Sequence, residues 1–211
     1  MMSDDHTGAA AEASAALPPA SRRGLRSLLD GNARFAEGTP RAQPHTASRV
    51  ALANRQEPFA VVLGCADSRV PVETIFDQEP GNVFVVRLAG NIADEDAMGS
   101  IEYAVAVLKA SLILVLGHSS CGAVTAAVSY VRDAVRQPGY IQRLVDAIEP
   151  AARAVERGEG DWIERAVVEN ARMNAAKLRA RSAIVAEAVG AGALGVAAGV
   201  YDLRSGKVTL V

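Results

Sequence analysis

The chain has 211 residues, of which 50% are hydrophobic, 4% aromatic and 22% charged, and its formal net charge is −2 at pH 7. This length favours a single α/β domain, with two small domains as the alternative. The small net charge argues against a general affinity for nucleic acid or for an anionic membrane. Because no apolar run reaches the roughly 18 residues that a membrane span needs, we expect no membrane association.

The chain begins with MMSDDHTGAAAEASAALPPA, which opens with acids and lacks the basic region and the continuous apolar run of a secretory signal. We therefore expect residues 1–20 to form a disordered N-terminal tail and residues 21–211 to form the domain. The same observation favours a reducing, cytoplasmic location. In such a compartment, two cysteines favour metal binding or catalysis over a single disulfide.

A helix opens the expected domain. The segment SRRGLRSLLDGNARFAEG places three leucines and Phe35 at helical spacing, and Ser21 is the predicted N-cap. The Gly- and Pro-containing GTPRAQPH ends this helix. A second, short helix is expected through Ser48–Asn54.

Three short apolar runs with β-branched residues follow, and each predicts a strand buried on both faces of a sheet. These runs are Phe59–Gly64, Asn82–Arg87 and Ser111–His118. Between the second and the third run, AMGSIEYAVAVLKA places Ile101, Val105 and Leu108 on one helical face. A strand, a helix and another strand in this order predict a crossover connection between parallel strands.

Helical patterns dominate the rest of the chain until its last residues. CGAVTAAVSYVRDAV predicts a helix, and two more are expected over Ile141–Arg157 and Ile163–Val189. The end, LGVAAGVYDLRSGKVTLV, predicts a strand, a Ser-Gly turn and a final strand. The expected fold is therefore a single α/β domain with a mainly parallel sheet flanked by helices and a C-terminal strand or hairpin at its edge.

Both cysteines follow predicted strands. Cys65 begins C-A-D-S-R, in which Asp67 and Arg69 face the same side if the segment is extended, and Cys121 ends H-S-S-C, three residues after His118. The carboxyl ends of parallel strands meet at one edge of a sheet, so the two segments can converge on one ion. Two thiolates and one imidazole suit Zn²⁺. Three protein ligands leave a fourth position open, as in catalytic zinc sites.

Each candidate ligand, taken alone, also has an ordinary structural interpretation. Cys65 at a strand end is most often a buried hydrophobic residue, and His118 is most often a core or cap residue. A Cys/His hydrolase would leave one cysteine idle and would need an oxyanion hole, of which no signature is evident; a C-x-x-C redox motif is absent. Cys121 also begins a predicted helix, whose N-terminus favours a thiolate. Together these features favour the metal centre.

C-A-D-S-R followed by G-H-S-S-C-G resembles the signature of the β-class carbonic anhydrases. The similarity continues in GNARFAEG, FDQEPGNVFVVRLAGN, GSIEYAV and GVYDLRSGKV, so that it covers residues 24–211. The resemblance implies reversible hydration of carbon dioxide to bicarbonate and a proton by zinc-bound hydroxide, with one Zn²⁺ per chain. It also implies a homodimer or homotetramer, because a second subunit completes the family's pocket.

The resemblance further implies a role for individual residues. Cys65, His118 and Cys121 are the zinc ligands, and Asp67 either pairs with Arg69 in a catalytic dyad or becomes a fourth ligand. The substrate-binding residues that match the family are Gln56, Phe84, Tyr103 and, through its backbone N–H, Gly122. A subgroup also binds a noncatalytic, regulatory bicarbonate through a tryptophan, an arginine and a tyrosine. Arg87 and Tyr201 match this set, whereas Val62 replaces the tryptophan and argues against such a site.

Two other functions remain open at the level of sequence. Relatives with this zinc site hydrolyse carbonyl sulfide or carbon disulfide, and the motifs do not separate these substrates from carbon dioxide. A noncatalytic zinc-binding module is a further alternative, which the presence of Asp67, Arg69 and Gln56 argues against. The single tryptophan, Trp162, is expected to serve packing.

Overall fold

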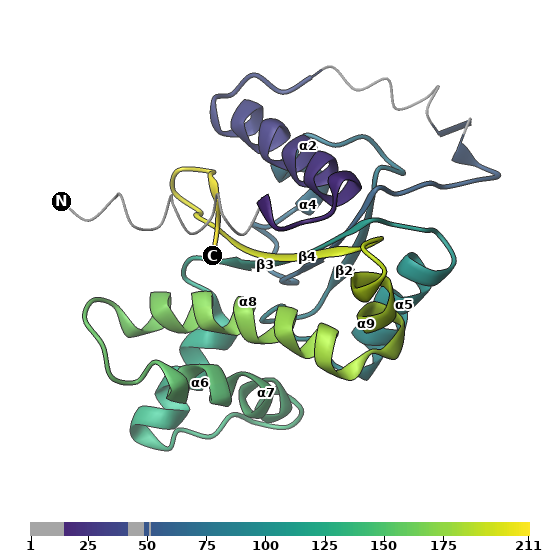
Figure 1. Cartoon of the computed structure of the whole chain (residues 1–211). Coiled ribbons are helices and arrows are strands. Elements are labelled where there is room, and N and C mark those ends of the chain that lie inside the picture. The colour runs from purple at the N-terminus through teal and green to yellow at the C-terminus, as the bar shows by residue number, and fades with distance from the viewer. Residues whose placement is uncertain (1–14, 42–48, 51) are drawn as a thin grey trace.

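A five-stranded sheet forms the centre of the described part of the chain, in the strand order β2-β1-β3-β4-β5 (Figure 1). The computed structural model describes residues 15–41, 49–50 and 52–211. The strands are β1 (Ala60–Gly64), β2 (Val83–Arg87), β3 (Leu112–His118), β4 (Gly195–Tyr201) and β5 (Val208–Leu210). The first four are parallel, and β5 pairs antiparallel with β4. The predicted fold class is confirmed.

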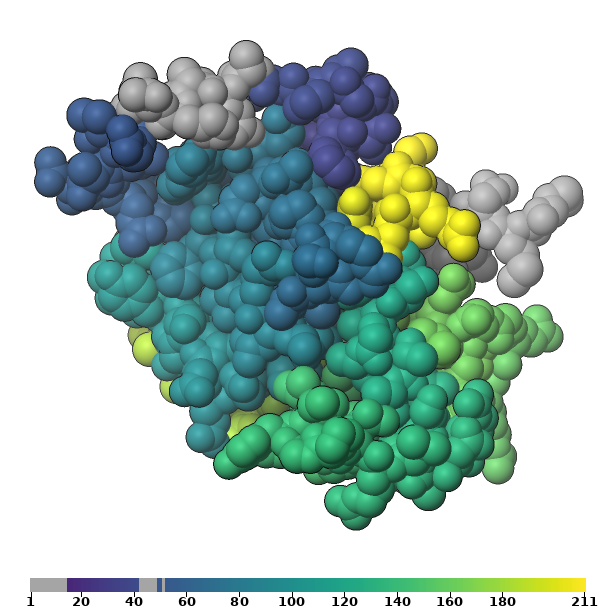
Figure 2. Space-filling model, turned by 180° about the vertical axis from the view of Figure 1, so that it is seen from behind, coloured from purple at the N-terminus to yellow at the C-terminus, as the bar shows by residue number. Residues whose placement is uncertain are grey.

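Helices cover both faces of the sheet (Figure 1). One face carries α2 (Pro19–Ala36) and α4 (Val72–Ile75), and the other carries α5 (Glu95–Ala106), α8 (Trp162–Arg181) and α9 (Ala183–Gly190). α6 (Gly122–Asp133) and α7 (Ile141–Ala154) pack against each other and against α8. Seen from behind, this pair lies in green below the blue and teal part of the chain (Figure 2).

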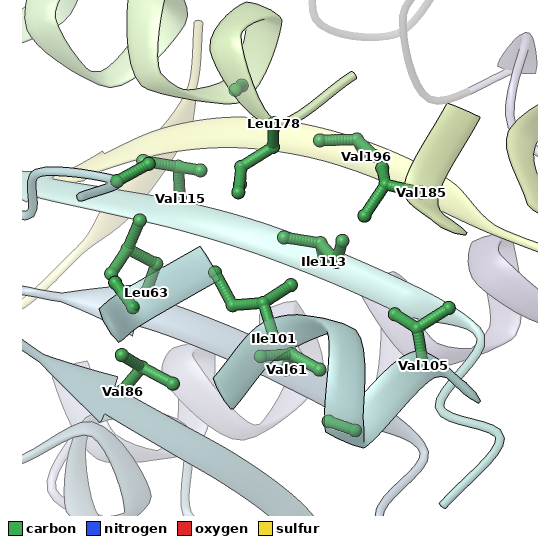
Figure 3. Packing of buried hydrophobic residues seen from close by; sticks show 14 of the residues in the cluster. Val61, Leu63, Val86, Ile101, Val105, Ile113, Val115, Leu178, Val185 and Val196 are labelled. Atoms are coloured by element: carbon green, nitrogen blue, oxygen red, sulfur yellow. The ribbon is translucent and has the colours of Figure 1, made fainter. Parts of the chain in front are cut away.

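Successive side chains of each strand point to opposite faces of the sheet, so there is a buried core on each face. Val61 and Leu63 of β1 lie near Ile101 of α5, and Leu178 of α8 lies beside Val115 of β3 in the same buried cluster (Figure 3). Val62 points to the opposite face, toward α2 and α4. Every residue of β1 and β3 is buried, as predicted. The prediction of full burial is wrong for β2, which is mostly half-buried because it lies at the edge of the sheet.

The first helix begins earlier than its sequence pattern indicated. Pro18 is the N-cap of α2 and Pro19 its first residue, a position that suits proline because its nitrogen needs no hydrogen bond there. Ser21 therefore is not the N-cap. It is fully buried inside the helix, and its hydroxyl donates to the carbonyl of Ser111 at 2.7 Å.

Part of the N-terminal prediction falls on residues that the structure does not describe. Residues 1–14 of the expected tail lie outside the described ranges, as do Ser48 and Ala51 of the expected short helix. Residues 49, 50 and 52 of that helix are described and are helical.

The helix expected over Ile163–Val189 is two helices, α8 and α9, that meet at Ser182. Ser182 has an extended backbone, and its hydroxyl oxygen accepts the Val185 N–H at 3.1 Å while its hydroxyl donates to Glu102 at 2.6 Å. The short helix α4 had no sequence signal. Trp162 packs as predicted, with its indole N–H donating to the Ala152 carbonyl at 2.9 Å. None of the described helices is long and apolar enough to cross a bilayer.

Candidate metal centre

The ligand atoms of Cys65, His118 and Cys121 lie within 4.8 Å of one another, and all three residues are buried. Cys65 directly follows β1, His118 is the last residue of β3, and Cys121 is the N-cap of α6. Because β1 and β3 are parallel neighbours, their carboxyl ends lie side by side. The structure thus brings together the three residues predicted to converge, and both cysteines are free thiols.

This position is also where the direction of the chain reverses across the sheet. From β1 the chain passes through α4 on one face to β2, and from β2 it returns through α5 on the other face to β3. In open α/β sheets, ligands bind at the carboxyl ends of the strands on either side of such a reversal, here β1 and β3.

A tight turn carries Cys121 back toward His118. Ser120 has φ 55°, in the left-handed region, and the Ser119 N–H donates to the Tyr201 carbonyl at 2.9 Å. His118 Nδ1 lies 2.9 Å from the Ser119 carbonyl oxygen, so Nδ1 carries the proton and donates it to that oxygen. His118 Nε2 then presents a lone pair. It is buried and has no hydrogen-bond partner among the described residues.

These donors fit a zinc ion. Tetrahedral zinc with bonds of about 2.3 Å to sulfur and about 2.0 Å to nitrogen requires ligand atoms roughly 3.5–3.8 Å apart. The observed limit of 4.8 Å is close to this spacing. A buried nitrogen without a partner, facing two thiols, would be costly in the absence of a ligand.

Backbone N–H groups stabilise negative charge on Cys65. Its sulfur accepts the N–H of Gly90 at 3.3 Å and of Asp67 at 3.4 Å. A hydrogen bond from Cys121 is the largest influence that holds the pKa of the Cys65 thiol well below its usual range, against the opposing effect of burial. The same hydrogen bond, together with burial, raises the pKa of Cys121. A bound metal would take both sulfurs as thiolates and displace their protons.

Asp67 and Arg69 form a bidentate pair beside the cluster. Arg69 donates from Nε to Asp67 Oδ1 at 2.9 Å and from a terminal nitrogen to Oδ2 at 2.7 Å. The pairing with Arg69 holds the pKa of Asp67 well below its usual range. Asp67 Oδ2 lies 3.9 Å from His118 Nε2. The carboxylate thus borders the candidate metal ligands while it is bound to Arg69.

Arg87 fixes the backbone of this turn, a role that sequence reasoning missed. Its guanidinium donates to the carbonyl of Cys65 at 3.0 Å and to the carbonyl of Asp67 at 2.6 Å. The other two positions matched to a regulatory bicarbonate site are little exposed: Val62 is fully buried and Tyr201 is 5% exposed, its ring 6.5 Å from that of Phe35.

The four residues matched to substrate binding do not lie together. Gly122 is exposed next to Cys121, at the first position of α6. Gln56 lies before the amino end of β1, where it lines an open groove of about 790 Å³ together with Tyr103. The Phe84 ring is 6.3 Å from that of Tyr103. Phe84 pairs in register with Val61, four residues or about 13 Å along the strand from the ligand Cys65.

Sequence reasoning also missed two asparagines of α8 that contact the loop after β2. Asn170 and Asn174 are 1% and 6% exposed, and they lie one helical turn apart among the buried apolar residues of α8. Two amides on the apolar face of a helix are the signal that could have revealed them, because buried polar groups need specific partners.

Comparison with known proteins indicates the family of this chain. A family model described as carbonic anhydrase matches residues 60–208. Carbonic anhydrase 2 of Mycobacterium tuberculosis is 40% identical over 186 residues, covering 88% of this chain and 90% of the relative. The carbonic anhydrase of Pseudomonas aeruginosa is 33% identical over 192 residues, covering 87% of this chain and 86% of the relative.

Solved structures agree with these sequences. The β-carbonic anhydrase of Coccomyxa, in complex with acetazolamide, has a TM-score of 0.70 and 30% identity, covering 87% of this chain and 84% of that chain. A β-carbonic anhydrase of Sordaria macrospora, described as tetrameric, has a TM-score of 0.69 and 26% identity, covering 90% of this chain and 97% of that chain. With the fold, the cysteine and histidine cluster and the relatives in agreement, this chain belongs to the β-class carbonic anhydrase family.

Proposed function

We propose that the protein catalyses the reversible hydration of carbon dioxide to bicarbonate and a proton, with one Zn²⁺ held by Cys65, His118 and Cys121. The observation that carries this proposal is the buried cluster of their ligand atoms within 4.8 Å, bordered by the Asp67–Arg69 pair. Three protein ligands leave one position for water, as catalysis requires. When bound, zinc supplies a Lewis acid that makes hydroxide available near neutral pH.

Asp67 orients the nucleophile in this proposal. Its ionised carboxylate, held by Arg69, accepts the hydrogen bond of the attacking water or hydroxide and turns a lone pair toward the carbon of carbon dioxide. Arg87 fixes the backbone of this turn, and Arg69 fixes the carboxylate of Asp67. Little reorganisation of Asp67 is therefore needed during the reaction. If Asp67 instead became a fourth metal ligand, its carboxylate would first have to leave Arg69.

Gly122 is placed to stabilise the charge that develops on a substrate oxygen. It is the first residue of α6, where backbone N–H groups have no partner within the helix and the helix dipole favours negative charge. The glycine is exposed, and apart from its chain neighbours and the backbone of its own helix no atom lies within 4 Å of the position that a Cβ would occupy. A small anionic product can therefore approach its backbone closely.

A second subunit supplies the rest of the substrate pocket in this proposal. Gln56, Phe84 and Tyr103 gather at the amino side of the sheet, away from the metal ligands of their own chain. Tyr103 is 48% exposed and lines the same groove as Gln56, so its ring is accessible to a second chain. In a symmetric dimer, each groove can face the metal centre of the other chain. The tetrameric relative supports assembly into a homodimer or homotetramer.

Complementation between two defective chains tests this shared pocket. Cys65→Ser removes a metal ligand and Gln56→Ala removes a substrate contact, so each variant alone is impaired. When the two are co-refolded, half of the dimers are mixed and each mixed dimer contains one intact pocket, so that about a quarter of the unmixed wild-type activity returns.

A mixture no more active than the average of the two variants would show that each pocket is built within one chain. The reaction itself is tested by stopped-flow carbon dioxide hydration and metal analysis on the same sample of wild-type protein. A zinc-loaded protein that leaves the hydration rate at its uncatalysed value would contradict the proposed function.

A further inference from the structure

The loop that follows β2 contacts the metal ligand Cys65 through one peptide group. The Gly90 N–H donates to Cys65 Sγ at 3.3 Å, in buried surroundings. Hydrogen bonds to a ligating sulfur orient it and set how much charge it gives to the metal, so groups outside the ligand shell affect affinity and electronic structure. Whatever fixes the position of Gly90 therefore acts on the metal centre.

Packing allows only glycine at this position. Gly90 has φ +77°, and a Cβ built on it would lie 2.4 Å from Cδ1 of Ile148 and 3.2 Å from Cβ of Ala123. The peptide thus fits between α6, which carries Ala123, and α7, which carries Ile148. These apolar neighbours limit the position of the Gly90 backbone, but they provide no hydrogen bond that would fix the orientation of its N–H and carbonyl groups.

Two asparagines of α8 provide those hydrogen bonds. Asn170 Nδ2 donates to the Gly90 carbonyl at 2.8 Å, and the Ala93 N–H donates to Asn174 Oδ1 at 2.8 Å. Asn174 Nδ2 in turn donates to the side-chain oxygen of Asn170 at 3.0 Å and to its carbonyl at 2.8 Å. The loop is therefore held at both of its ends by one pair of side chains.

The identities of the partners fix how each amide is oriented. Asn174 must present its oxygen to the Ala93 N–H, so its nitrogen faces Asn170. This leaves the Asn170 oxygen as acceptor and directs its nitrogen to the Gly90 carbonyl. Asparagine is a poor residue for a helix interior and is costly to bury. The two amides are satisfied only because the loop is present, so the loop and this face of α8 depend on each other.

We propose that Asn170 and Asn174 are positioning residues of the metal centre, which hold the backbone of Gly90 so that its N–H donates to the sulfur of Cys65. This inference rests on the zinc site of the proposed function. Asn170 acts through Gly90, because it holds the peptide that follows the Gly90 Cα and so limits the peptide that precedes it, whose N–H reaches Cys65. Asn174 acts through Asn170 and Ala93. Neither asparagine touches the metal or the substrate.

Cobalt(II) in place of zinc provides a readout that does not depend on activity. A thiolate that loses a hydrogen bond gives electron density to the metal more easily, so its sulfur-to-cobalt charge-transfer band moves to longer wavelength. Asn170→Ala is expected to shift this band and to weaken zinc binding by about 10–100-fold, measured by competition with a chelator. Asn174→Ala should shift the band in the same direction by less, because Asn170 still reaches Gly90.

Asn32→Ala is the matched control. Asn32 is also a buried amide, 4% exposed, whose nitrogen donates to two carbonyls and whose oxygen accepts one N–H, but it lies on α2 at the opposite face of the sheet. Its loss should lower the melting temperature and leave the cobalt band unchanged. If Asn170→Ala does not fold, Asn170→Ser, which keeps a small polar group but is too short to reach Gly90, carries the same test.

A cobalt band that stays in place in folded Asn170 variants, while their melting temperature falls as in Asn32→Ala, would overturn the proposal and leave a purely structural role. If the unmodified chain bound neither zinc nor cobalt, the proposed function and this inference would fail together. If it bound metal without hydrating carbon dioxide, only the proposed function would fail, and the band shift would still decide the role of the asparagines.

Discussion

The two ends of the sheet differ in how complete they are within one chain. At the carboxyl end, the candidate metal ligands are buried, lie within 4.8 Å of one another and are supported by side chains from β2 and α8. At the amino side, Gln56 is exposed and Tyr103 is 48% exposed beside an open groove. The first region is enclosed by residues of its own chain. The second region is exposed, so that only another chain could enclose its side chains.

This difference follows from the physical demands of each task. A metal centre needs ligands held to within a fraction of an ångström, and rigid strand ends with satisfied hydrogen bonds supply that precision. A pocket for a small, weakly polar substrate needs to surround the molecule more than to bind it tightly. Enclosure can come from the approach of a second surface. The predictions below separate the two regions by asking which of them each substitution affects.

The largest effect is expected from His118→Ala. Removing one of three ligands leaves two thiols that hold zinc poorly, so we expect purified protein to contain almost no zinc and carbon dioxide hydration to fall to its uncatalysed rate. Metal analysis and stopped-flow assays on one sample measure both quantities. Full zinc content in this variant would show that the buried cluster is not the metal site.

A smaller loss is expected from Arg69→Ala, which frees Asp67 without removing a ligand. Turnover should fall by about 10²-fold, since Asp67 loses the partner that orients it, while zinc content stays at the wild-type level. The side chain of Arg69 is 55% exposed, and exposed ion pairs contribute little to stability, so the melting temperature should stay close to that of the wild type. Arg132→Ala, which breaks a similarly exposed pair with Asp133, is the control and should change neither turnover nor zinc content.

Gln56→Ala tests the exposed side of the molecule alone. Loss of one hydrogen bond to substrate is worth about 1–2 kcal/mol, which corresponds to a decrease of roughly 5–30-fold in kcat/KM. Zinc content and melting temperature should not change, because Gln56 is exposed and distant from the ligands along β1. A zinc-depleted Gln56→Ala protein would contradict the separation of the two regions.

The smallest effect is expected at the turn between β4 and β5, which contacts Ser119 beside the candidate metal centre but contributes no ligand to it. Hydrogen bonds from the hydroxyl and the N–H of Ser205 lower the pKa of Asp202. A lowered pKa in the folded state stabilises the fold above the ordinary carboxyl value and loses that contribution as pH falls through the lower, folded value. The free energy of unfolding of Asp202→Asn should therefore be slightly lower than that of the wild type at pH 7. Urea unfolding at several pH values should show that the two free energies become more similar toward pH 3. A difference that grows in acid would contradict this sign.

Much of the fold could be predicted because its signals are local. The apolar runs that became β1 and β3 and the helical spacing that became α5 are repeated patterns of short range, and they were confirmed. The errors arose where a distant residue decided the outcome. Ser21 lies inside a helix because it bonds to Ser111, and Ser182 ends α8 with its hydroxyl bound to Glu102. Neither partner is near in sequence.

For the site, the sequence by itself determined the ligand types, because two cysteines and one strand-end histidine limit the chemistry to a thiolate and imidazole set. Only the tertiary structure decided how these groups are supported. The contact of Asn170 with Gly90 spans 80 residues, and that of Arg87 with Cys65 spans 22. Hydrogen bonds at such separations depend on the packing of whole helices against the sheet, and no local pattern records them. The exposure of Gln56 and Tyr103 is likewise decided only after β1, β2 and α5 have packed, because the fold alone determines which surfaces are left uncovered.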